Sequence, residues 1–357
     1  MPWKVSWRVT VDGRDMSAGM RPYLISISVS DKDGMASDSA SLTFDDAVGQ
    51  LLLPKGGAKV AIELDGVPIF EGVVDGTPWA MARGSGRILS VSAKGLDTRG
   101  RTKEGQTWHL DDATLDEALQ KGAKAAGLEG ITVDRELGQL KRPYWSPQGA
   151  SFLGWARRLA ADHGATFKVR GSRAVFAKRG QGASAAGGAM PTVEARISGN
   201  VINAQIDPAQ GRRAFKAARV RYFDRKKATF EEKDVEIGAD DTEAVNVRRF
   251  TAADGDEADA IGRGRRSDAE RERATGTIEM DLEPAAQAEG TLNLTGARAG
   301  IDGSYRIVGV THKADRGGGA TTTVEIKQPQ GEAGKDTRTP TESAAPLNVP
   351  VPTPRPN

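Results

Sequence analysis

The first hundred residues alternate between apolar and polar side chains with a period of two. Successive side chains of a strand point to opposite faces, so this alternation predicts strands that bury one face. Asp-Gly pairs between the segments tolerate positive φ and predict tight reversals. Short strands at this spacing predict a β-sandwich or barrel. The predicted strands cover residues 5–11, 24–30, 39–44, 59–64, 69–74 and 88–93.

A helical period replaces this alternation after residue 105. Asp111 and Asp112 are suited to cap the start of a helix, and Gly127 is suited to end it. The spacing of the apolar residues between them predicts an amphipathic helix. Its apolar stripe is formed by Leu115, Ala118, Leu119, Gly122 and Ala126.

A second helix is predicted to begin at Pro147, because proline at the first helical position costs no hydrogen bond. Gly164 is expected to end this helix, and a hairpin turned at Gly171 follows it. These elements predict a small α/β domain over residues 105–180. The apolar stripe of the second helix is Phe152, Trp155, Ala156, Leu159 and Ala160.

A Gly-, Ala- and Ser-rich segment at residues 181–191 predicts a linker. The period of two then returns, interrupted by a charge-dense stretch at 252–274 that predicts a solvated helix. Gly262 and Gly264 weaken that helix by about 1 kcal/mol each relative to alanine. The expected strands of this second β region cover residues 193–197, 201–206, 217–223, 275–282, 290–294, 305–310 and 321–326.

The fold class expected from this order is α+β and mainly β. Two tube-like antiparallel β-barrel or sandwich domains are expected at 1–104 and 192–328, separated by the small α/β domain and the linker. Residues 329–357 hold seven of the chain's 17 prolines and predict an extended or disordered proline-rich tail.

Composition excludes several classes of function but does not identify one. The 357-residue chain has no cysteine, which excludes disulfides, thiolate nucleophiles and cysteine metal sites. Its 50 basic and 48 acidic residues give a formal charge of +2 and no global attraction to nucleic acid or anionic membrane. The start alternates too strictly for a signal peptide, and no apolar run approaches the roughly 18 residues of a membrane helix. We expect a soluble chain with no membrane anchoring.

The motifs that suggest chemistry fail on inspection. Asp31 and Asp33 have the spacing of an EF-hand start, but Met35 and Ala36 stand where that loop needs an oxygen ligand and a glycine. A turn between strands is the better interpretation. Segments that begin like a glycine-rich phosphate loop or a serine nucleophile elbow lack the remaining residues of those motifs.

Titratable residues also have structural interpretations. His109, His163 and His312 are far apart in the sequence and lie in no zinc-binding motif. Adjacent acids at 45–46, 111–112 and 240–241 are interpreted as caps and turns rather than the separated carboxyl pair of a glycosidase. We therefore expect no catalytic, cofactor-binding or metal-binding residue and no cofactor.

The strongest local charge feature is a basic segment that contains a single acid, Asp224. Strand alternation puts Arg219 and Arg221 on one face and Val220 and Tyr222 on the other. The basic face would suit a lumen for DNA or an interface with an acidic subunit, and a solvated strand face is an equal alternative. A second basic cluster at 263–273 is interleaved with acids and is expected to pair within its helix. The candidate lumen or interface residues are Arg212, Arg213, Lys216, Arg219, Arg221, Arg225, Lys226 and Lys227.

In domain order and in three segments the chain resembles the late control D family, the baseplate hub of contractile phage tails. The segments are 37–46, the helix of 151–160 with its hairpin, and the hairpin of 303–326 with its Tyr-x-Ile-x-x-Val-x-His pattern. The chain departs from the family at 146–151, where a Gln-x-x-Glu-Ser sequence is common. That departure affects a local loop contact rather than the fold.

The resemblance implies a structural protein, not an enzyme. It implies a homotrimer whose subunits each contribute two tube-like β domains to a pseudo-sixfold ring, with tail tube subunits above and a central spike below. Tape measure protein and baseplate wedge are further implied partners, and DNA would pass through the lumen. The implied location is the virion tail baseplate, after assembly in the bacterial host cytoplasm. The alternatives are a type VI-like spike or hub protein, which shares this fold, and a tail-associated peptidoglycan hydrolase.

Overall fold

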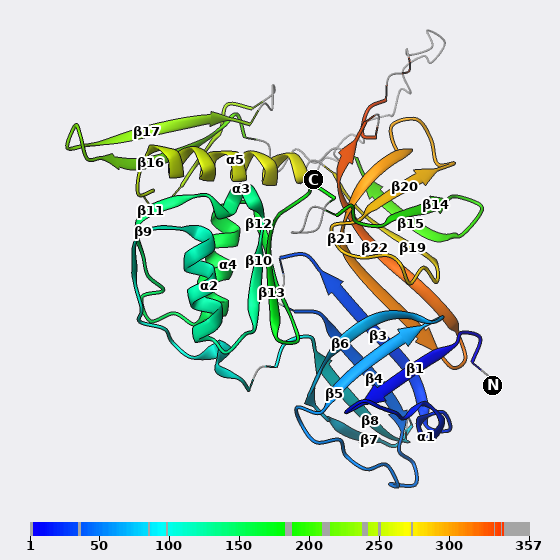
Figure 1. Cartoon of the computed structure of the whole chain (residues 1–357). Helices are drawn as coiled ribbons and strands as arrows, with labels where there is room; N and C mark the ends of the chain where they lie inside the picture. The colour runs from blue at the N-terminus through cyan, green and yellow to red at the C-terminus, as the bar shows by residue number, and fades with distance from the viewer. Residues whose placement is uncertain are drawn as a thin grey trace, which may run out of the picture.

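The described chain is mainly β and of the α+β class, as expected. A computed structural model represents the protein, and Figure 1 shows two β units on one side and all labelled helices but the short α1 on the other. The expected tail from residue 339 and parts of the expected linker lie outside the described residues. The structure describes residues 3–34, 37–84, 86–97, 99–182, 188–208, 215–237, 242–248, 251–272, 274–331, 333–336 and 338.

The first β unit contains the strands that the alternating pattern predicts. Inward side chains such as Val9, Ile27, Leu42, Ile62 and Leu89 are buried and form its core. A short helix, α1 (Ser17–Met20), follows the first hairpin. The strands are β1 (Trp7–Val11), β2 (Arg14–Asp15), β3 (Leu24–Lys32), β4 (Ser39–Asp45), β5 (Lys59–Leu64), β6 (Val67–Gly76), β7 (Trp79–Ala82) and β8 (Gly86–Lys94).

The second β unit repeats the strand order of the first. In sheet order the first unit reads β3-β4-β8-β6-β5-β1 and the second reads β15-β19-β22-β21-β20-β14. If the strands of each series are numbered from first to last along the chain, the two series have the same order in the sheet. They differ in the last pair, because β1 runs antiparallel to β5 whereas β14 runs parallel to β20. The strands are β14 (Thr192–Arg196), β15 (Val201–Asp207), β19 (Thr275–Asp281), β20 (Thr291–Thr295), β21 (Gly303–Asp315) and β22 (Gly319–Gln330).

One strand pair joins the two units into a single sheet. β3 lies antiparallel to β21, in register from Ser26 opposite Asp315 to Lys32 opposite Gly309. The long β21 and β22 reach from the second unit down to the first (Figure 1). We call this β3–β21 pair the internal joint.

The α/β unit lies beside this sheet (Figure 1). Its helices pack on one face of a three-stranded sheet around Trp145, Phe152, Trp155, Phe167 and Phe176. The two predicted helices and the predicted hairpin are present. The elements are η1 (Arg101–Lys103), β9 (Leu110–Thr114), α2 (Leu115–Ala125), β10 (Gly130–Val133), α3 (Arg135–Gly138), β11 (Lys141–Trp145), α4 (Phe152–Asp162), β12 (Ala165–Arg170) and β13 (Arg173–Lys178).

Both predicted helix starts were wrong. Thr114 caps α2, because its side chain and that of Glu117 form a reciprocal capping box, while Asp111 and Asp112 lie within strand β9. Ser151 caps α4 by accepting a hydrogen bond from Gly154 N at 3.2 Å. Pro147 therefore lies in the preceding loop.

A separate three-stranded sheet follows β15 in sequence. Its strands are β16 (Ala217–Asp224), β17 (Thr229–Glu236) and β18 (Val245–Val247), and α5 (Gly255–Arg271) packs on one face of it. Val220, Ala258 and Ile261 are buried between them. The hairpin of β16 and β17 projects away from both β units (Figure 1). The predicted helix is thus present, but it is half-buried rather than solvated.

The glycines of α5 are close-packing positions. A Cβ on Gly264 would lie 2.8 Å from Gly164 N, and one on Gly262 would lie 2.3 Å from Val235 Cγ2. Gly164, which follows α4, has a φ of +60°. The two glycines therefore let α5 approach both the α/β unit and β17, at the expense of helix propensity.

We predict that Gly264→Ala lowers the unfolding free energy by about 1–3 kcal/mol, because the added methyl group overpacks the contact with Gly164. Gly255→Ala is the matched control in the same helix, since its Cβ would meet only ordinary contacts at 3.5 Å. Denaturant unfolding followed by circular dichroism measures both. Equal stability of the two variants would contradict the close-packing role.

Candidate functional site: a charged junction and a basic hairpin

Buried charges meet where the three units of the chain touch. Asp31 of β3 and Asp38 beside β4 both pair with Lys168 of β12, the Asp38 contact at 2.7 Å. Arg170 Nε donates to Asp38 Oδ2 at 3.2 Å. Asp31 Oδ2 also accepts from Ala288 N of the second β unit at 3.1 Å. The Asp31 carboxylate therefore contacts all three units.

The pKa values of the two carboxyl groups are shifted in opposite directions. Burial alone would raise the pKa of Asp31, but the Lys168 ammonium and the Ala288 N–H outweigh it and lower that pKa. Burial raises the pKa of Asp38, and the adjacent Asp31 charge raises it further. Lys168, with Arg170 as a second cation, thus makes this pair of acids compatible with burial.

A second set of ion pairs continues the junction. Arg271 at the end of α5 pairs with Asp33 and, at 3.0 Å, with Glu289. Glu289 in turn accepts from Gly180 N at 2.6 Å. The interpretation of Asp31 and Asp33 as turn residues was therefore incomplete, because both carboxylates bridge the β3–β4 hairpin to other units. The expectation that Arg271 pairs within its helix was wrong.

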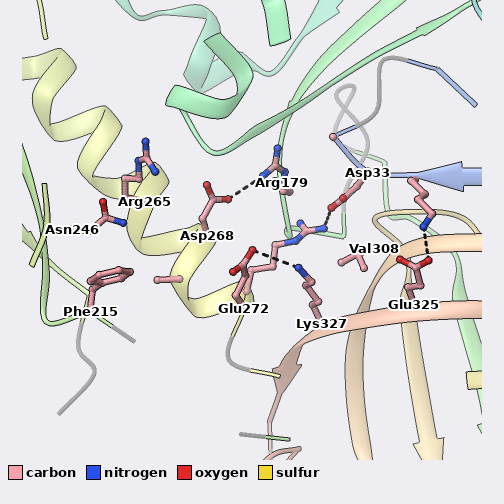
Figure 2. A pocket seen from close by; sticks show the side chains of 14 residues that line it. Asp33, Arg179, Phe215, Asn246, Arg265, Asp268, Glu272, Val308, Glu325 and Lys327 are labelled. Atoms are coloured by element: carbon pink, nitrogen blue, oxygen red, sulfur yellow. Dashed lines mark hydrogen bonds and ion pairs between the residues drawn. The ribbon is translucent and has the colours of Figure 1, made fainter. Parts of the chain in front are cut away.

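A pocket of about 520 Å³ opens beside these pairs (Figure 2). Its walls come from β3, α5, β18, β21 and β22 and from the segment that follows β13. Four of its cations face acids within 4 Å, so they are neutralised within the chain. These pairs are Lys32–Glu325 at 2.6 Å, Arg179–Asp268 at 3.1 Å, Lys327–Glu272 at 3.5 Å and Arg271–Asp33. The pocket is the cleft of an ion-paired contact between units.

Among the described residues no group of three or more His, Asp or Glu side chains is placed to hold a metal ion. In the same part of the chain no helix is long and apolar enough to cross a membrane. Trp79 Nε1 donates to Asp46 Oδ2 at 3.1 Å, so Asp46 has a structural contact. Asp240 and Asp241 lie outside the described residues.

The three histidines occupy different environments. His312 of β21 is buried with Nδ1 3.0 Å from Thr322 Oγ1, and His109 stacks on Tyr144. His163 follows α4 and is buried, and neither ring nitrogen has a hydrogen-bond partner among the described residues. Burial, reinforced by the Arg142 and Arg248 guanidinium groups, lowers the pKa of His163 to about 3.

The structure shows how the basic segment is arranged. Arg219 forms a bidentate pair with Asp234, both bonds at 2.7 Å, and Arg221 lies over the Phe230 ring at 4.3 Å. Val220 faces α5, as alternation predicts. β17 thus supplies acids opposite the bases of β16. Lys216, Arg225, Lys226 and Lys227 also lie at this sheet, whereas Arg212 and Arg213 lie outside the described residues.

The sequence interpretation missed Lys168 and β17, and it assigned Arg271 to the wrong partners. Lys168 stands at a polar position of an alternating strand, which is also where a solvated lysine would stand. β17 carries charges on both faces, so its alternation is hidden. The one hint of a pairing partner in the sequence was that the acid-rich residues 229–236 directly follow the basic segment.

The comparisons with known proteins agree with the expected family. The chain is 28% identical over 192 residues to the probable baseplate hub protein of Escherichia phage P2, and 26% identical over 190 residues to that of Escherichia phage 186. The resemblance to baseplate hub proteins is confirmed. The matched parts make up 52% of this chain and 49% and 48% of the two relatives, so the chain spans about half the length of the curated relatives it matches. No family model matches the chain.

Solved tail proteins share the fold over most of the chain. The 43 kDa tail protein of prophage MuSo2 from Shewanella oneidensis has a TM-score of 0.68 at 14% identity, covering 90% of this chain and 97% of that one. A tail protein from Neisseria meningitidis MC58 has the same TM-score and identity, with coverages of 91% and 97%. An Escherichia coli protein described as a component of the type VI secretion system has a TM-score of 0.56 at 12% identity, with coverages of 92% and 79%.

We predict that Lys168→Met lowers the unfolding free energy at pH 7 by about 3–5 kcal/mol, because it leaves two buried carboxylates with only the more exposed Arg170 guanidinium as a neighbouring cation. The loss should shrink as the pH falls and the acids take up protons. Lys178→Met is the control on the same sheet, because its partner Glu136 is exposed and the expected loss is below about 1 kcal/mol. Urea unfolding at pH 7 and pH 5 measures both, and equal losses would contradict the buried role.

We predict that His163 makes the chain acid-sensitive. Its pKa is lower in the folded chain than in the unfolded chain, so the folded state keeps its full stability above about pH 6.5. Stability then falls as the pH drops from there toward about 3, by roughly 1 kcal/mol per pH unit from this group. His163→Phe should remove that part of the slope. An unchanged slope in the variant would show that other groups carry the acid sensitivity.

Proposed function

We propose that this protein is the baseplate hub of a contractile tail or a related injection device. In this role three copies form a pseudo-sixfold ring that joins the sixfold tail tube to the threefold spike. The single observation that carries the proposal is the internal repeat, since one chain holds two β units of the same strand order in one sheet. Three such chains supply six units, which suits a part that matches sixfold and threefold neighbours.

The repeated units also leave strand edges that a ring would cover. β7 and β15 each lie at an edge of the sheet, and exposed edges are an association hazard unless another chain pairs with them. Similarity to probable baseplate hub proteins supports the assignment. The proposal includes assembly in the host cytoplasm, contacts with tape measure protein and wedge, and DNA passage through the lumen. It also includes the domain division at 1–104, 105–180, 181–191, 192–328 and 329–357.

We also propose that the β16–β17 hairpin is an interface rather than a lumen wall. It projects away from both β units (Figure 1), and its outer face combines paired charges with exposed Phe223 and Phe230, whose rings lie 5.1 Å apart. Mixed charge with an exposed aromatic pair suits a protein contact better than a phosphate track. Lys216, Arg219, Arg221, Arg225, Lys226 and Lys227 would be contacts there.

A type VI-like hub is the second candidate. The fold match to an Escherichia coli type VI component over 92% of this chain favours it. The two candidates share the ring and differ in the particle that carries it. Copurification with tube subunits of a phage tail or of a secretion system separates them.

We predict that the purified chain forms trimers. Three copies of 37.8 kDa give a mass of about 113 kDa, because 3 × 37.8 = 113.4. Mass photometry, alone and with a cognate spike, measures the distribution directly. A chain that stays monomeric at 37.8 kDa in both samples would refute the hub proposal.

A further inference from the structure

The two β units share the register of their strand pairs as well as their order. β4 pairs with β8 over seven residues, and β19 pairs with β22 over seven residues. The first pairing runs from Ser39–Lys94 to Asp45–Ile88, and the second runs from Thr275–Lys327 to Asp281–Thr321. The positions in these strands can therefore be matched one to one.

The irregularities repeat at the same places. The pairing of β3 with β4 skips one residue after Leu24, and the pairing of β15 with β19 skips one after Val201. In the same way the pairing of β6 with β8 shifts just before Gly76, and that of β21 with β22 shifts just before Gly309. Bulges at equal positions anchor the match of β3 to β15 and of β6 to β21.

β7 completes the match to β21. It continues β6 along β8, with Trp79 opposite Leu89 and Ala82 opposite Gly86. Counting from Gly76 and from Gly309, Trp79 corresponds to His312. In the same count Arg83 corresponds to Arg316, which follows β21. The part of β21 that forms the internal joint is therefore the counterpart of β7.

The counterparts of the joint strands have no strand on their outer edges among the described residues. β7 pairs only with β8, and β15 pairs only with β19. Trp79 is 51% exposed and Met81 is 63% exposed, although both alternate on the face that is buried in the second unit. Ala204 of β15 is also exposed. Each chain thus carries two free edges that correspond to the two halves of its own internal joint.

We propose that β15 of one copy adds antiparallel to β7 of the next, in the register with which β3 adds to β21. This interface rests on the proposed ring, and its occupant is a second copy of this chain. The match of positions places Trp79 opposite Ile206, Ala80 opposite Gln205, Met81 opposite Ala204 and Ala82 opposite Asn203. The contact is head-to-tail, which closes into a ring when the rotation allows it.

The side chains fit this pairing. In the internal joint His312 and Ala314 lie opposite Val29 and Ile27, and all four are buried. Their counterparts bring Trp79 to Ile206 and Met81 to Ala204. The exposed apolar side chains of β7 would leave water on association, which favours the pairing.

The backbone fits as well. Asp33 N donates to Val308 O and Arg316 N donates to Ile25 O, each at 2.9 Å. The backbone N–H and C=O groups of every second residue of β21 therefore point toward β3. By this alternation Thr311 directs its N–H away from β3. Pro78 corresponds to Thr311. The N–H that proline lacks would therefore point away from the free edge of β7, and that edge keeps all its hydrogen-bonding groups.

An arginine side chain forms hydrogen bonds beyond the last strand pair of the internal joint. Arg316 Nη2 donates to Arg21 O at 3.0 Å and to Pro22 O at 2.8 Å. Arg83 stands at the corresponding position, is exposed, and would reach the backbone just before β15 of the next copy.

Disulfide trapping tests the register directly, because the full-length chain has no cysteine of its own. Ala80 and Gln205 are exposed in the single chain and correspond to Lys313 and Ser28, a non-hydrogen-bonded pair. Such pairs have Cα atoms about 4.5 Å apart, within disulfide reach. Mild oxidation of A80C/Q205C should give covalent dimers and trimers on non-reducing gels.

Two controls use the same chemistry. S28C/K313C should form its disulfide within one chain and leave the mass unchanged. A80C/N203C moves one partner by two residues and should give at least about tenfold less covalent trimer, because diagonal pairs are about 7–8 Å apart. Equal trapping of A80C/N203C and A80C/Q205C would overturn the register.

A non-covalent variant gives a second measurement. Met81→Glu should leave the unfolding midpoint unchanged and weaken trimer formation at least about tenfold, because it places a charge where apolar side chains meet. Met16→Glu, also on an exposed methionine of the first β unit, should leave assembly unchanged. Trimers that form without trapping and withstand Met81→Glu would overturn the interface and leave the hub proposal standing. A chain that remains monomeric would overturn both.

Discussion

The antiparallel pairing of β3 with β21 is the constraint on which the rest of the structure depends. It makes two β units one sheet, and it fixes where the β3–β4 hairpin delivers its acids. Asp31 and Asp38 are buried there because Lys168 lies between them, and Asp33 is held by Arg271. Buried charges of this kind add little net stability, but removing one partner is costly. They therefore hold the α/β unit and α5 in one orientation to the sheet.

The proposed function rests on the internal repeat of the sheet. The sheet edges at β7 and β15 match the two halves of the β3–β21 pair in register, so the proposed contact between chains would repeat the contact made within the chain. Ring closure by this contact would cover the edges that a single chain leaves open. The β16–β17 hairpin lies away from this sheet (Figure 1), which suits its proposed role as an interface.

Local physics made much of the fold predictable. The stripes of α2 and α4 and the alternation of the first β unit depend on residues close in sequence, and each predicts its element. The helix starts were wrong because capping depends on one hydrogen bond, which Thr114 makes with Glu117 and Ser151 makes with Gly154. Gly264 is unfavourable in an isolated helix, and only the approach of Gly164 explains it. The charged junction was not predictable, because Asp31 and Lys168 lie 137 residues apart. Two tube-like β domains were expected, but their shared strand order and register were not, because register, not residue identity, is what recurs.

Amide hydrogen exchange of the assembled and the dissociated chain tests the central claim most directly, because it reports each strand edge separately. The account predicts that, within residues 79–82 and 203–206, the amides that point away from β8 and β19 exchange freely in the monomer and become protected in the ring. Protection there should reach that of β3 and β21, while Thr229–Glu236 of the hairpin stays unchanged in the isolated ring. A ring that forms while both segments continue to exchange at monomer rates would contradict the account.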